Sequence, residues 1–366
     1  MKKVMLVFGT RPEAIKMCPL ILEMKKRTEI DCIVCLTGQH REMLDQVNIL
    51  FGITANYDLD IMQEGQALSD ITSKVLQGLN PILDKEKPDV MLVHGDTTTS
   101  FAAALAAFYR NIPIGHVEAG LRTYNMNSPY PEEFNRQAVD LICTYYFAPT
   151  ETAKKHLINE GKSQSDIFVT GNTVIDALRT TVDSSFSDEN IEWASGSRLI
   201  LLTSHRRENI GYNMKQIFQA VNDIVYEYPD VKVIYPLHKN PKVREIAYQY
   251  FNNNDRVRLI EPLDVYHFHN YIQQCFLIMT DSGGVQEEAP SLGKPVLVLR
   301  ENTERPEGVV AGTLKLVGVE RESVYKGVRE LLDDHELYNK MSKSSNPYGD
   351  GNASKYIVDA LLKITR

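Results

Sequence analysis

Short, wholly apolar runs alternate along the chain with longer segments whose apolar positions have helical spacing. The apolar runs are bounded by Gly, Pro or Asp and lack a polar face, which is typical of parallel strands covered on both sides. In the first half, this pattern predicts strands at 3–8, 31–36, 89–94, 113–117, 145–148 and 166–169, with helices at 13–27, 40–51, 68–86, 98–109, 132–142 and 151–160.

The same alternation begins again after residue 195. Strands that alternate with helices predict right-handed βαβ units and a doubly wound sheet, and two such series predict two such domains. The Ser- and Asp-rich stretch 183–197 is interpreted as the linker or its edge. The second series consists of strands at 198–203, 231–236, 257–260, 275–280, 295–299 and 313–317, and helices at 213–227, 241–251, 284–290, 321–332 and 353–365.

Length and charge narrow the class of protein. A chain of 366 residues agrees with two domains at about 150 residues each. Apolar residues make up 43% and charged residues 24%, which is ordinary for a globular protein and excludes a disordered one. The net charge of −8 gives no general attraction to nucleic acid or anionic membrane. A bound anion therefore requires a local cluster of cationic residues.

Membrane, redox and metal functions are not expected. The longest apolar run, Phe101–Tyr109, has nine residues, whereas a bilayer span needs about 20. Five scattered cysteines are typical of a reduced, cytoplasmic protein. Cys32 and Cys35 fall in a predicted strand and point to opposite faces, so they are expected in the core. His267 and His269 do not share a helix face, so no zinc site is predicted.

Cationic residues follow the first predicted strand. The segment Gly9–Lys16 is a glycine turn that leads into a helix with Pro12 near its first position. Arg11 and Lys16 then lie near exposed helix amides, which suits a negatively charged ligand group. The segment is neither a Walker motif nor a dinucleotide fingerprint. A tight turn with solvated charges is the structural alternative.

Three acidic residues follow later strands. Asp96 comes after the strand at 89–94, Glu118 after the strand at 113–117, and Glu132 begins a helix that also carries Arg136. Carboxylates at one sheet edge are the groups that proton removal and return at carbon would require. Two structural alternatives remain open. Asp96 could be a helix N-cap, and Glu132 could form a surface pair with Arg136 worth about 0.2–0.5 kcal/mol.

The second half has two further candidate segments. His205, Arg206 and Arg207 directly follow the strand at 198–203 and form a cationic spot in an acidic protein. The segment Asp281–Glu288 follows the strand at 275–280 and carries two glycines at a helix start. Such a turn lets backbone amides approach a phosphate closely, and Glu288 could accept hydrogen bonds from ribose hydroxyls. A solvated loop and a plain glycine turn are the respective alternatives.

These motifs resemble the bacterial non-hydrolysing UDP-N-acetylglucosamine 2-epimerases. The resemblance implies an α/β fold of two doubly wound, Rossmann-like domains facing a central cleft, as in GT-B glycosyltransferases. It implies an N-terminal domain at 1–172 with the acid/base residues, a UDP-binding domain at 173–352, and a last helix at 353–366 that packs back on the first domain. The similarity rests on residues 9–16, 94–97, 118–123, 131–136, 205–208, 281–288, 303–307 and 346–351.

The resemblance also implies an activity. UDP-GlcNAc and UDP-ManNAc would interconvert without NAD or metal, by elimination of UDP to 2-acetamidoglucal and its re-addition. A GT-B glycosyltransferase, a hydrolysing 2-epimerase and a catalytically silent nucleotide-sugar sensor are the alternatives. A cytoplasmic homodimer is expected, and neither nucleic acid nor a membrane is expected as a partner because no basic stripe with interleaved aromatic residues appears.

The residues that match the family's functional positions form three groups. An acid/base role is implied for Asp96, Glu118 and Glu132, and an activity-critical role for Lys16, Arg136 and His205. Nucleotide contacts are implied for Arg11, Phe268, Ser282, Gly283, Gly284, Glu288 and Arg305. A possible second, activating UDP-GlcNAc site would use Gln39, His40, Glu132, Arg206 and His238.

Three positions depart from the pattern of activated members. Glu42 and Gly65 stand where those members carry Gln and Arg, and Leu263 stands where some carry a polar residue near the uracil. Substrate activation is therefore left open.

Overall fold

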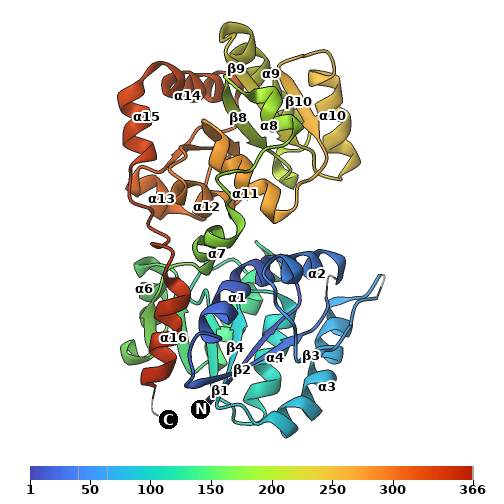
Figure 1. The fold of residues 1–366 in the computed structure, drawn as a ribbon, viewed down its shortest axis with the longest axis vertical. Coiled ribbons are helices and arrows are strands. Elements are labelled where there is room, and N and C mark those ends of the chain that lie inside the picture. The colour runs from blue at the N-terminus through green and yellow to red at the C-terminus, as the bar shows by residue number, and fades with distance from the viewer. Residues whose placement is uncertain (40, 64, 365–366) are drawn as a thin grey trace. The chain divides into compact units, whose positions relative to one another are not determined.

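The computed structural model describes residues 1–39, 41–63 and 65–364. The chain forms two compact units, one comprising Met1–Thr180 with the segment from Tyr348 onward, the other comprising Thr181–Pro347. Each unit has one parallel sheet with helices packed on it (Figure 1). The predicted α/β class of two doubly wound sheets is thus confirmed.

Unit 1 has a seven-stranded sheet in the order β3-β2-β1-β4-β5-β6-β7, and every pairing is parallel. The strand order reverses direction beside β1, where β4 is its neighbour, and ligands of such sheets bind at the carboxyl ends next to that point. The strands are β1 (Lys2–Phe8), β2 (Ile30–Leu36), β3 (Tyr57–Asp58), β4 (Val90–His94), β5 (Ile114–Val117), β6 (Tyr145–Ala148) and β7 (Ile167–Val169).

The helices of unit 1 cover both faces of this sheet. Helix α4 packs against α3 and α5, and its buried alanines at 102–104, 106 and 107 allow that close approach. The helices are α1 (Arg11–Met24), α2 (Arg41–Leu50), α3 (Leu68–Glu86), α4 (Thr98–Phe108), α5 (Glu132–Ile142), α6 (Glu151–Asn159), α7 (Thr173–Thr181) and α16 (Ala353–Lys363), with a short 3₁₀ helix η1 (Gln164–Asp166).

Unit 2 has a six-stranded parallel sheet in the order β10-β9-β8-β11-β12-β13. Its strands are β8 (Arg198–Thr203), β9 (Val231–Pro236), β10 (Val257–Ile260), β11 (Leu277–Thr280), β12 (Val296–Val298) and β13 (Leu314–Leu316). Its helices are α8 (Glu189–Ala194), η2 (Arg207–Asn209), α9 (Tyr212–Glu227), α10 (Pro241–Phe251), α11 (Val265–Gln274), α12 (Val285–Ser291), α13 (Pro306–Ala311), α14 (Arg321–Asp333) and α15 (His335–Ser342).

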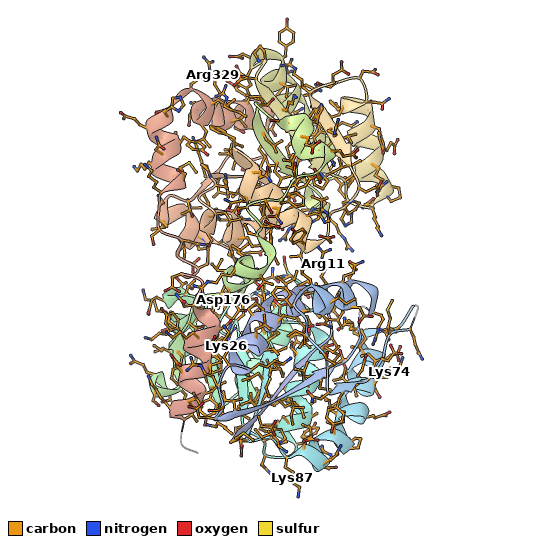
Figure 2. All side chains as sticks on the ribbon, viewed as in Figure 1. Arg11, Lys26, Lys74, Lys87, Asp176 and Arg329 are labelled. Atoms are coloured by element: carbon orange, nitrogen blue, oxygen red, sulfur yellow. The ribbon has the colours of Figure 1, made fainter. Side chains whose placement is uncertain are left out.

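The chain crosses between the units at Thr180/Thr181 and at Pro347/Tyr348. The sequence-based boundaries fall at 172/173 and 352/353. Helix α7 accounts for the difference at the first crossing, because it packs within unit 1. There the Asp176 carboxylate accepts hydrogen bonds from the backbone N–H groups of Ala353 and Ser354 at 3.1 and 2.8 Å. Asp176 is labelled in Figure 2.

The stretch 183–197, interpreted as the linker or its edge, belongs to unit 2 and contains helix α8. Asp188 caps this helix by accepting from two backbone N–H groups, and the Tyr271 hydroxyl donates to the other Asp188 oxygen at 2.6 Å. The polar stretch therefore contains a short helix that is hydrogen-bonded to α11, and it is not a free linker.

Within 1–39, 41–63 and 65–364, no helix combines the length and apolar character needed to cross a bilayer. All five cysteines are unpaired with one another. Burial raises the pKa of Cys35 to about 12 and that of Cys32 to about 11, so neither thiol ionises readily.

Candidate active site

Two neighbouring strand-end turns of unit 1 bring candidate acids together. Strand β4 leads into Gly95 and Asp96, and β5 leads into Glu118, with His94 paired to Val117 in the sheet. Gly95 and Glu118 both have left-handed backbones, with φ of 62° and 68°. Such a conformation is costly for Glu118, and strain of this kind clusters at functional sites. A Cβ on Gly95 would lie 3.6 Å from Glu118 Oε1, so the two turns are close neighbours.

Glu118 pairs with a cation from another element. Its Oε2 atom accepts from Lys16 Nζ of α1 and, at 2.6 Å, from Asn172 Nδ2 after β7. His94 Nε2 lies 3.7 Å from the same oxygen. Burial lowers the pKa of His94 to about 3, although Glu118 opposes the shift, so its imidazole is neutral at pH 7. The structure thus brings together Lys16 and Glu118, two candidates that the sequence analysis named separately.

Asp96 lies against helix α5. Its Oδ2 atom accepts from Arg136, and its backbone carbonyl accepts from Asn135 Nδ2 at 2.9 Å. Burial raises the pKa of the Asp96 carboxyl, Arg136 opposes this, and Glu118 adds to it. The N-cap of α4 is Thr97, whose hydroxyl accepts from Ser100 N. The alternative that Asp96 is the N-cap is therefore wrong, because its carboxylate does not cap α4 and instead pairs with Arg136.

Glu132 has a different environment from the one its spacing suggested. Arg136 pairs with Asp96 and, at 3.5 Å, with Glu133, so no ion pair joins it to Glu132 in the described part of the chain. Glu132 Oε2 is buried and has no hydrogen-bond partner among the described residues. A buried carboxylate oxygen without a partner is costly unless a ligand or water meets it.

Two neighbouring turns of unit 2 form a second cluster. Strands β8 and β11 pair through Thr203 and Thr280, so Ser204–Arg206 and Asp281–Gly284 leave the sheet side by side. Asp281 is fully buried, and its Oδ2 atom accepts from the backbone N–H groups of His205 and Arg206 at 2.9 and 3.0 Å. One carboxylate therefore fixes the turn that carries His205 and Arg206.

The His205 ring lies close to Asp281, with 3.7 Å between His205 Nδ1 and Asp281 Oδ1. It stacks on the His238 ring, with centroids 5.2 Å apart and planes 7° apart. Burial lowers the pKa of His205, Asp281 opposes this, and His238 and Arg206 add to it. The result favours a neutral imidazole at physiological pH.

The glycine turn has charged neighbours on both sides. A Cβ on Gly283 would lie 3.7 Å from an Arg206 guanidinium nitrogen, and one on Gly284 would lie 3.5 Å from Glu288 Oε1. Glu288 Oε2 in turn lies 3.5 Å from His269 Nε2. The Ser282 backbone N–H donates to Thr280 at 2.9 Å. A small anionic group would meet one guanidinium and a backbone without side chains here.

The remaining candidates have other partners. Arg305 pairs with the buried Glu287, and Phe268 packs in an apolar cluster with Leu263. Gln39 accepts from the Thr99 hydroxyl at 2.8 Å. Arg11 begins α1 and is labelled in Figure 2. His40 lies outside the described residues, as does the side chain of Glu42.

Sequence reasoning missed Glu13 as a member of this region. The fully buried carboxylate of Glu13 accepts from the backbone N–H groups of Gly9 and Thr10 and from the hydroxyls of Thr97 and Ser100. It thereby connects the turns after β1 and β4. The Thr10-x-x-Glu13 spacing is a capping-box signature, which could have revealed part of this role.

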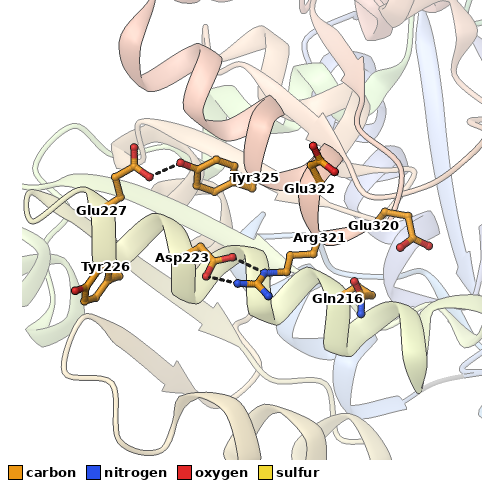
Figure 3. Close-up of a pocket in the computed structure, with 8 residues that line it drawn as sticks. All are labelled: Gln216, Asp223, Tyr226, Glu227, Glu320, Arg321, Glu322 and Tyr325. Carbon is orange, nitrogen blue, oxygen red and sulfur yellow. Dashed lines mark hydrogen bonds and ion pairs between the residues drawn. The ribbon is translucent and has the colours of Figure 1, made fainter.

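Neither a metal-ligand cluster nor the hollow over α9 and α14 adds a candidate residue in the described part of the chain. In the described ranges, no group of three or more His, Cys, Asp or Glu residues is placed to hold a metal ion. A surface hollow of about 760 Å³ lies over α9 and α14 (Figure 3) and contains none of the candidate residues. Two side-chain pairs lie within it, with Arg321 donating twice to Asp223 at 2.6 and 2.8 Å and the Tyr325 hydroxyl donating to Glu227.

Comparisons with known proteins agree on one family. The family model described as UDP-N-acetylglucosamine 2-epimerase matches residues 22–362. The UDP-N-acetylglucosamine 2-epimerase of Bacillus subtilis is 58% identical over 360 residues, which cover 98% of this chain and 95% of that protein.

Solved structures of about half-identical sequence share the fold. The Neisseria meningitidis UDP-GlcNAc 2-epimerase bound to UDP-GlcNAc is 50% identical with a TM-score of 0.90, covering 99% of this chain and 100% of that one. The S. aureus MnaA–UDP complex is 52% identical with a TM-score of 0.91, covering 99% and 96%. Together with the match of the family model over nearly the whole sequence, these likenesses show that the chain belongs to the UDP-N-acetylglucosamine 2-epimerase family.

Proposed function

We propose that the protein interconverts UDP-GlcNAc and UDP-ManNAc by eliminating UDP and adding it back, without hydrolysis. The observation that carries this proposal is the set of three strand-end and helix-start carboxylates in unit 1, Asp96, Glu118 and Glu132, in a chain of this family. A glycosyltransferase needs one base and an acceptor groove, and a nucleotide-sugar sensor needs neither base nor acid. Three carboxylates exceed both needs.

In this proposal, carboxyl groups of unit 1 carry out the proton transfers. A carboxylate takes the proton from C2 of the sugar, the C1–O bond breaks, and its electron pair leaves with the β-phosphate of UDP. The product is 2-acetamidoglucal, which has a C1–C2 double bond. A second carboxyl then gives a proton to the opposite face of C2, and UDP adds back to C1. The raised pKa of Asp96 suits a group that both binds and returns a proton.

In this proposal, residues of unit 2 stabilise the negative charge of the leaving UDP. The C2–H bond is a weak acid, so elimination needs both a positioned base and a stabilised diphosphate. Arg206 lies beside the glycine turn, and the proposed UDP contacts of unit 2 are Phe268, Ser282, Gly283, Gly284, Glu288 and Arg305. Arg11 is the proposed contact from unit 1, where Lys16 and Arg136 neutralise Glu118 and Asp96. His205 is proposed to act as a neutral imidazole at the diphosphate.

The family resemblance also implies assembly as a homodimer and residence in the cytoplasm. It leaves open whether a second UDP-GlcNAc activates the protein through Gln39, His40, Arg206 and His238. Activation predicts a sigmoidal rate curve and no turnover from UDP-ManNAc alone. A hyperbolic curve, with independent turnover of UDP-ManNAc, would contradict it.

Proton NMR of the purified protein with UDP-GlcNAc in D₂O, without added metal or NAD, tests the reaction. We expect the C2 proton signal to disappear while UDP-ManNAc appears, because the proton returned to C2 comes from solvent-exchanged carboxyl groups. Free UDP with free ManNAc would indicate the hydrolysing reaction. An unchanged spectrum with intact UDP binding would favour a transferase or sensor.

The same assay tests the carboxylates. We expect Asp96→Asn and Glu118→Gln each to lower turnover by at least about 10²-fold, since positioned acid–base groups contribute about 10²–10⁴-fold. UDP affinity should stay within about threefold of wild type because the proposed UDP contacts lie mainly in unit 2. Wild-type turnover in either variant would remove that residue from the mechanism.

A further inference from the structure

A buried histidine connects the two acid-bearing turns of unit 1. His116 lies on β5, two residues before Glu118, and is fully buried. Its Nε2 atom lies 2.7 Å from the Gly95 carbonyl oxygen, directly before Asp96. Its Nδ1 atom lies 2.6 Å from Asp140 Oδ1 on α5. One ring therefore contacts the turn after β4, the strand before Glu118, and the helix behind them.

Asp140 extends the connection to the second turn. Its Oδ2 atom accepts from the backbone N–H of Gly120 at 3.1 Å, two residues after Glu118. Arg122 donates to the same oxygen at 2.7 Å and has a fully buried side chain. Burial acts to raise the pKa of Asp140, but His116 and Arg122 outweigh it and hold the pKa below its usual range. Asp140 is therefore a carboxylate.

Hydrogen-bond accounting defines the state of the ring. The Gly95 carbonyl can only accept, and a carboxylate can only accept. Both ring nitrogens of His116 must therefore donate, one to each partner. A neutral ring would leave one buried acceptor facing a lone pair, which costs the desolvation of that group. Charge-assisted bonds of this kind are the stronger ones, and they fix the ring in one orientation.

We propose that His116 and Asp140 are positioning residues of the epimerisation, which hold the Gly95–Asp96 turn and the Glu118–Gly120 turn in a fixed register. This inference rests on the proposed function, because it matters only if Asp96 and Glu118 act on one sugar carbon. A shift of about 1 Å at a reacting group can cost about 10²-fold in rate. Helix α5 serves both turns, since Arg136 and Asn135 also contact Asp96.

Two substitutions of His116 each keep one of its two side-chain contacts and remove the other. In His116→Gln, the amide nitrogen takes the place of Nε2 and still reaches the Gly95 carbonyl. In His116→Asn, the amide nitrogen takes the place of Nδ1 and reaches only Asp140. We expect H116N to lower kcat by about 10–10²-fold with little change in KM. We expect the kcat of H116Q to be at least about fivefold higher than that of H116N.

The ratio of deuterium label in the two UDP-sugars (the partition ratio) distinguishes a positioning role of His116 from a role in folding stability. In D₂O, the intermediate takes up deuterium on either face of C2, so recovered UDP-GlcNAc and newly formed UDP-ManNAc both become labelled. The ratio of the two labels at early times does not depend on how much protein is folded. We expect H116N to change this ratio by at least about threefold, and H116Q to stay nearer to wild type.

Tyr146→Phe provides the matched structural control. The Tyr146 hydroxyl donates to the carbonyls of Asp140 and Cys143 at the end of α5, at 3.0 and 2.8 Å. Its loss should lower the midpoint of thermal unfolding without changing the partition ratio. Equal behaviour of H116N, H116Q and Y146F would assign His116 a structural role only and overturn the proposal, as would wild-type kcat in H116N.

Asp140→Asn gives an independent measurement if H116N fails to fold. It keeps the side-chain shape while removing the charge that orients His116, so a change in the ratio is again expected, and an unchanged ratio in D140N overturns the proposal. Wild-type protein in the same series tests the proposed function separately. If wild type epimerises and the variants behave like it, only the positioning role is wrong; if wild type does not epimerise, both inferences fall.

Discussion

Single residues at strand ends could be singled out from sequence, but their partners could not. Asp96, Glu118 and Lys16 stand out because each follows an apolar strand. Asn172, which donates to Glu118, comes 54 residues later, and nothing in the sequence relates the two. Hydrogen-bond partners that distant meet only once the sheet order is set, so burial and protonation could not be predicted.

The buried His94 has a consequence for stability. Its pKa is about 3 in the folded protein, chiefly through burial, against about 6.5 for an exposed histidine. In the pH window from 6.5 down to 3, the unfolded chain binds a proton that the folded chain does not. His94 therefore lowers the free energy of unfolding by about 1.4 kcal/mol for each pH unit below 6.5.

Comparison of wild type with His94→Gln isolates this effect, because other titrating groups contribute to both proteins. Hydrogen exchange at β4 amides gives the free energy of unfolding of unit 1 at each pH. We expect the two proteins to have parallel curves above pH 7 and to diverge below 6.5, with wild type losing more. Parallel curves down to pH 5 would show that His94 is not buried in its neutral form.

At the scale of elements, most strands and helices were predicted, including the three-residue strands β7, β12 and β13, but several other short elements were not. Strand β1 and helix α4 fall within a residue or two of their expected ranges. Strand β3 has two residues and helix α13 has six, too few for any periodicity to show. Helix α8 forms because Asp188 caps it and Tyr271 contacts that cap, which is a tertiary effect.

Helix α16 depends on a carboxylate from another element. Its N-cap residue Asn352 makes no side-chain capping bond, and the Asp176 carboxylate accepts from Ala353 N and Ser354 N instead. We expect Asp176→Ala to lower the free energy of unfolding by about 1–3 kcal/mol, because two buried N–H groups lose their acceptor. Hydrogen exchange along 353–363 should rise first, since this helix is the element that loses its cap.

Asp359→Asn is the matched control on the same helix. Asp359 pairs with Arg27 of α1 at 3.0 Å, but the Asp359 side chain is 36% exposed. Exposed pairs of this kind contribute about 0–1 kcal/mol. An effect of D359N as large as that of D176A would mean that general docking of α16, rather than its cap, governs stability.

At the scale of the whole molecule, the number and class of domains follow from the repeated strand–helix pattern, but the strand order does not. Both sheets place the fourth strand of the series beside the first, and this depends on which face each crossover helix covers. The order matters because it makes β4 and β5, and likewise β8 and β11, neighbours. Candidate residues from distant segments become adjacent only through that order.

The proposed assignment of UDP binding to unit 2 can be tested on the full chain with UDP alone. A ligand held by one unit stabilises that unit, by about 2.7 kcal/mol at a concentration 100 times its Kd. We expect UDP to slow hydrogen exchange at 203–206 and 281–284 and to leave the turns at 95–96 and 118–120 nearly unchanged. The only tryptophan, Trp193, lies in unit 2, so its fluorescence should report a raised unfolding midpoint.

Two arginines of unit 2 make this prediction specific. Arg305 pairs with buried Glu287 beside the glycine turn, whereas Arg321 pairs with Asp223 in the surface hollow of Figure 3. Because a charged contact to phosphate is the stronger kind of hydrogen bond, Arg305→Gln should weaken UDP binding by at least about tenfold. Arg321→Gln should leave UDP binding unchanged. Protection that appears mainly in the turns of unit 1, or equal loss in both variants, would place the nucleotide contacts elsewhere than in the glycine turn.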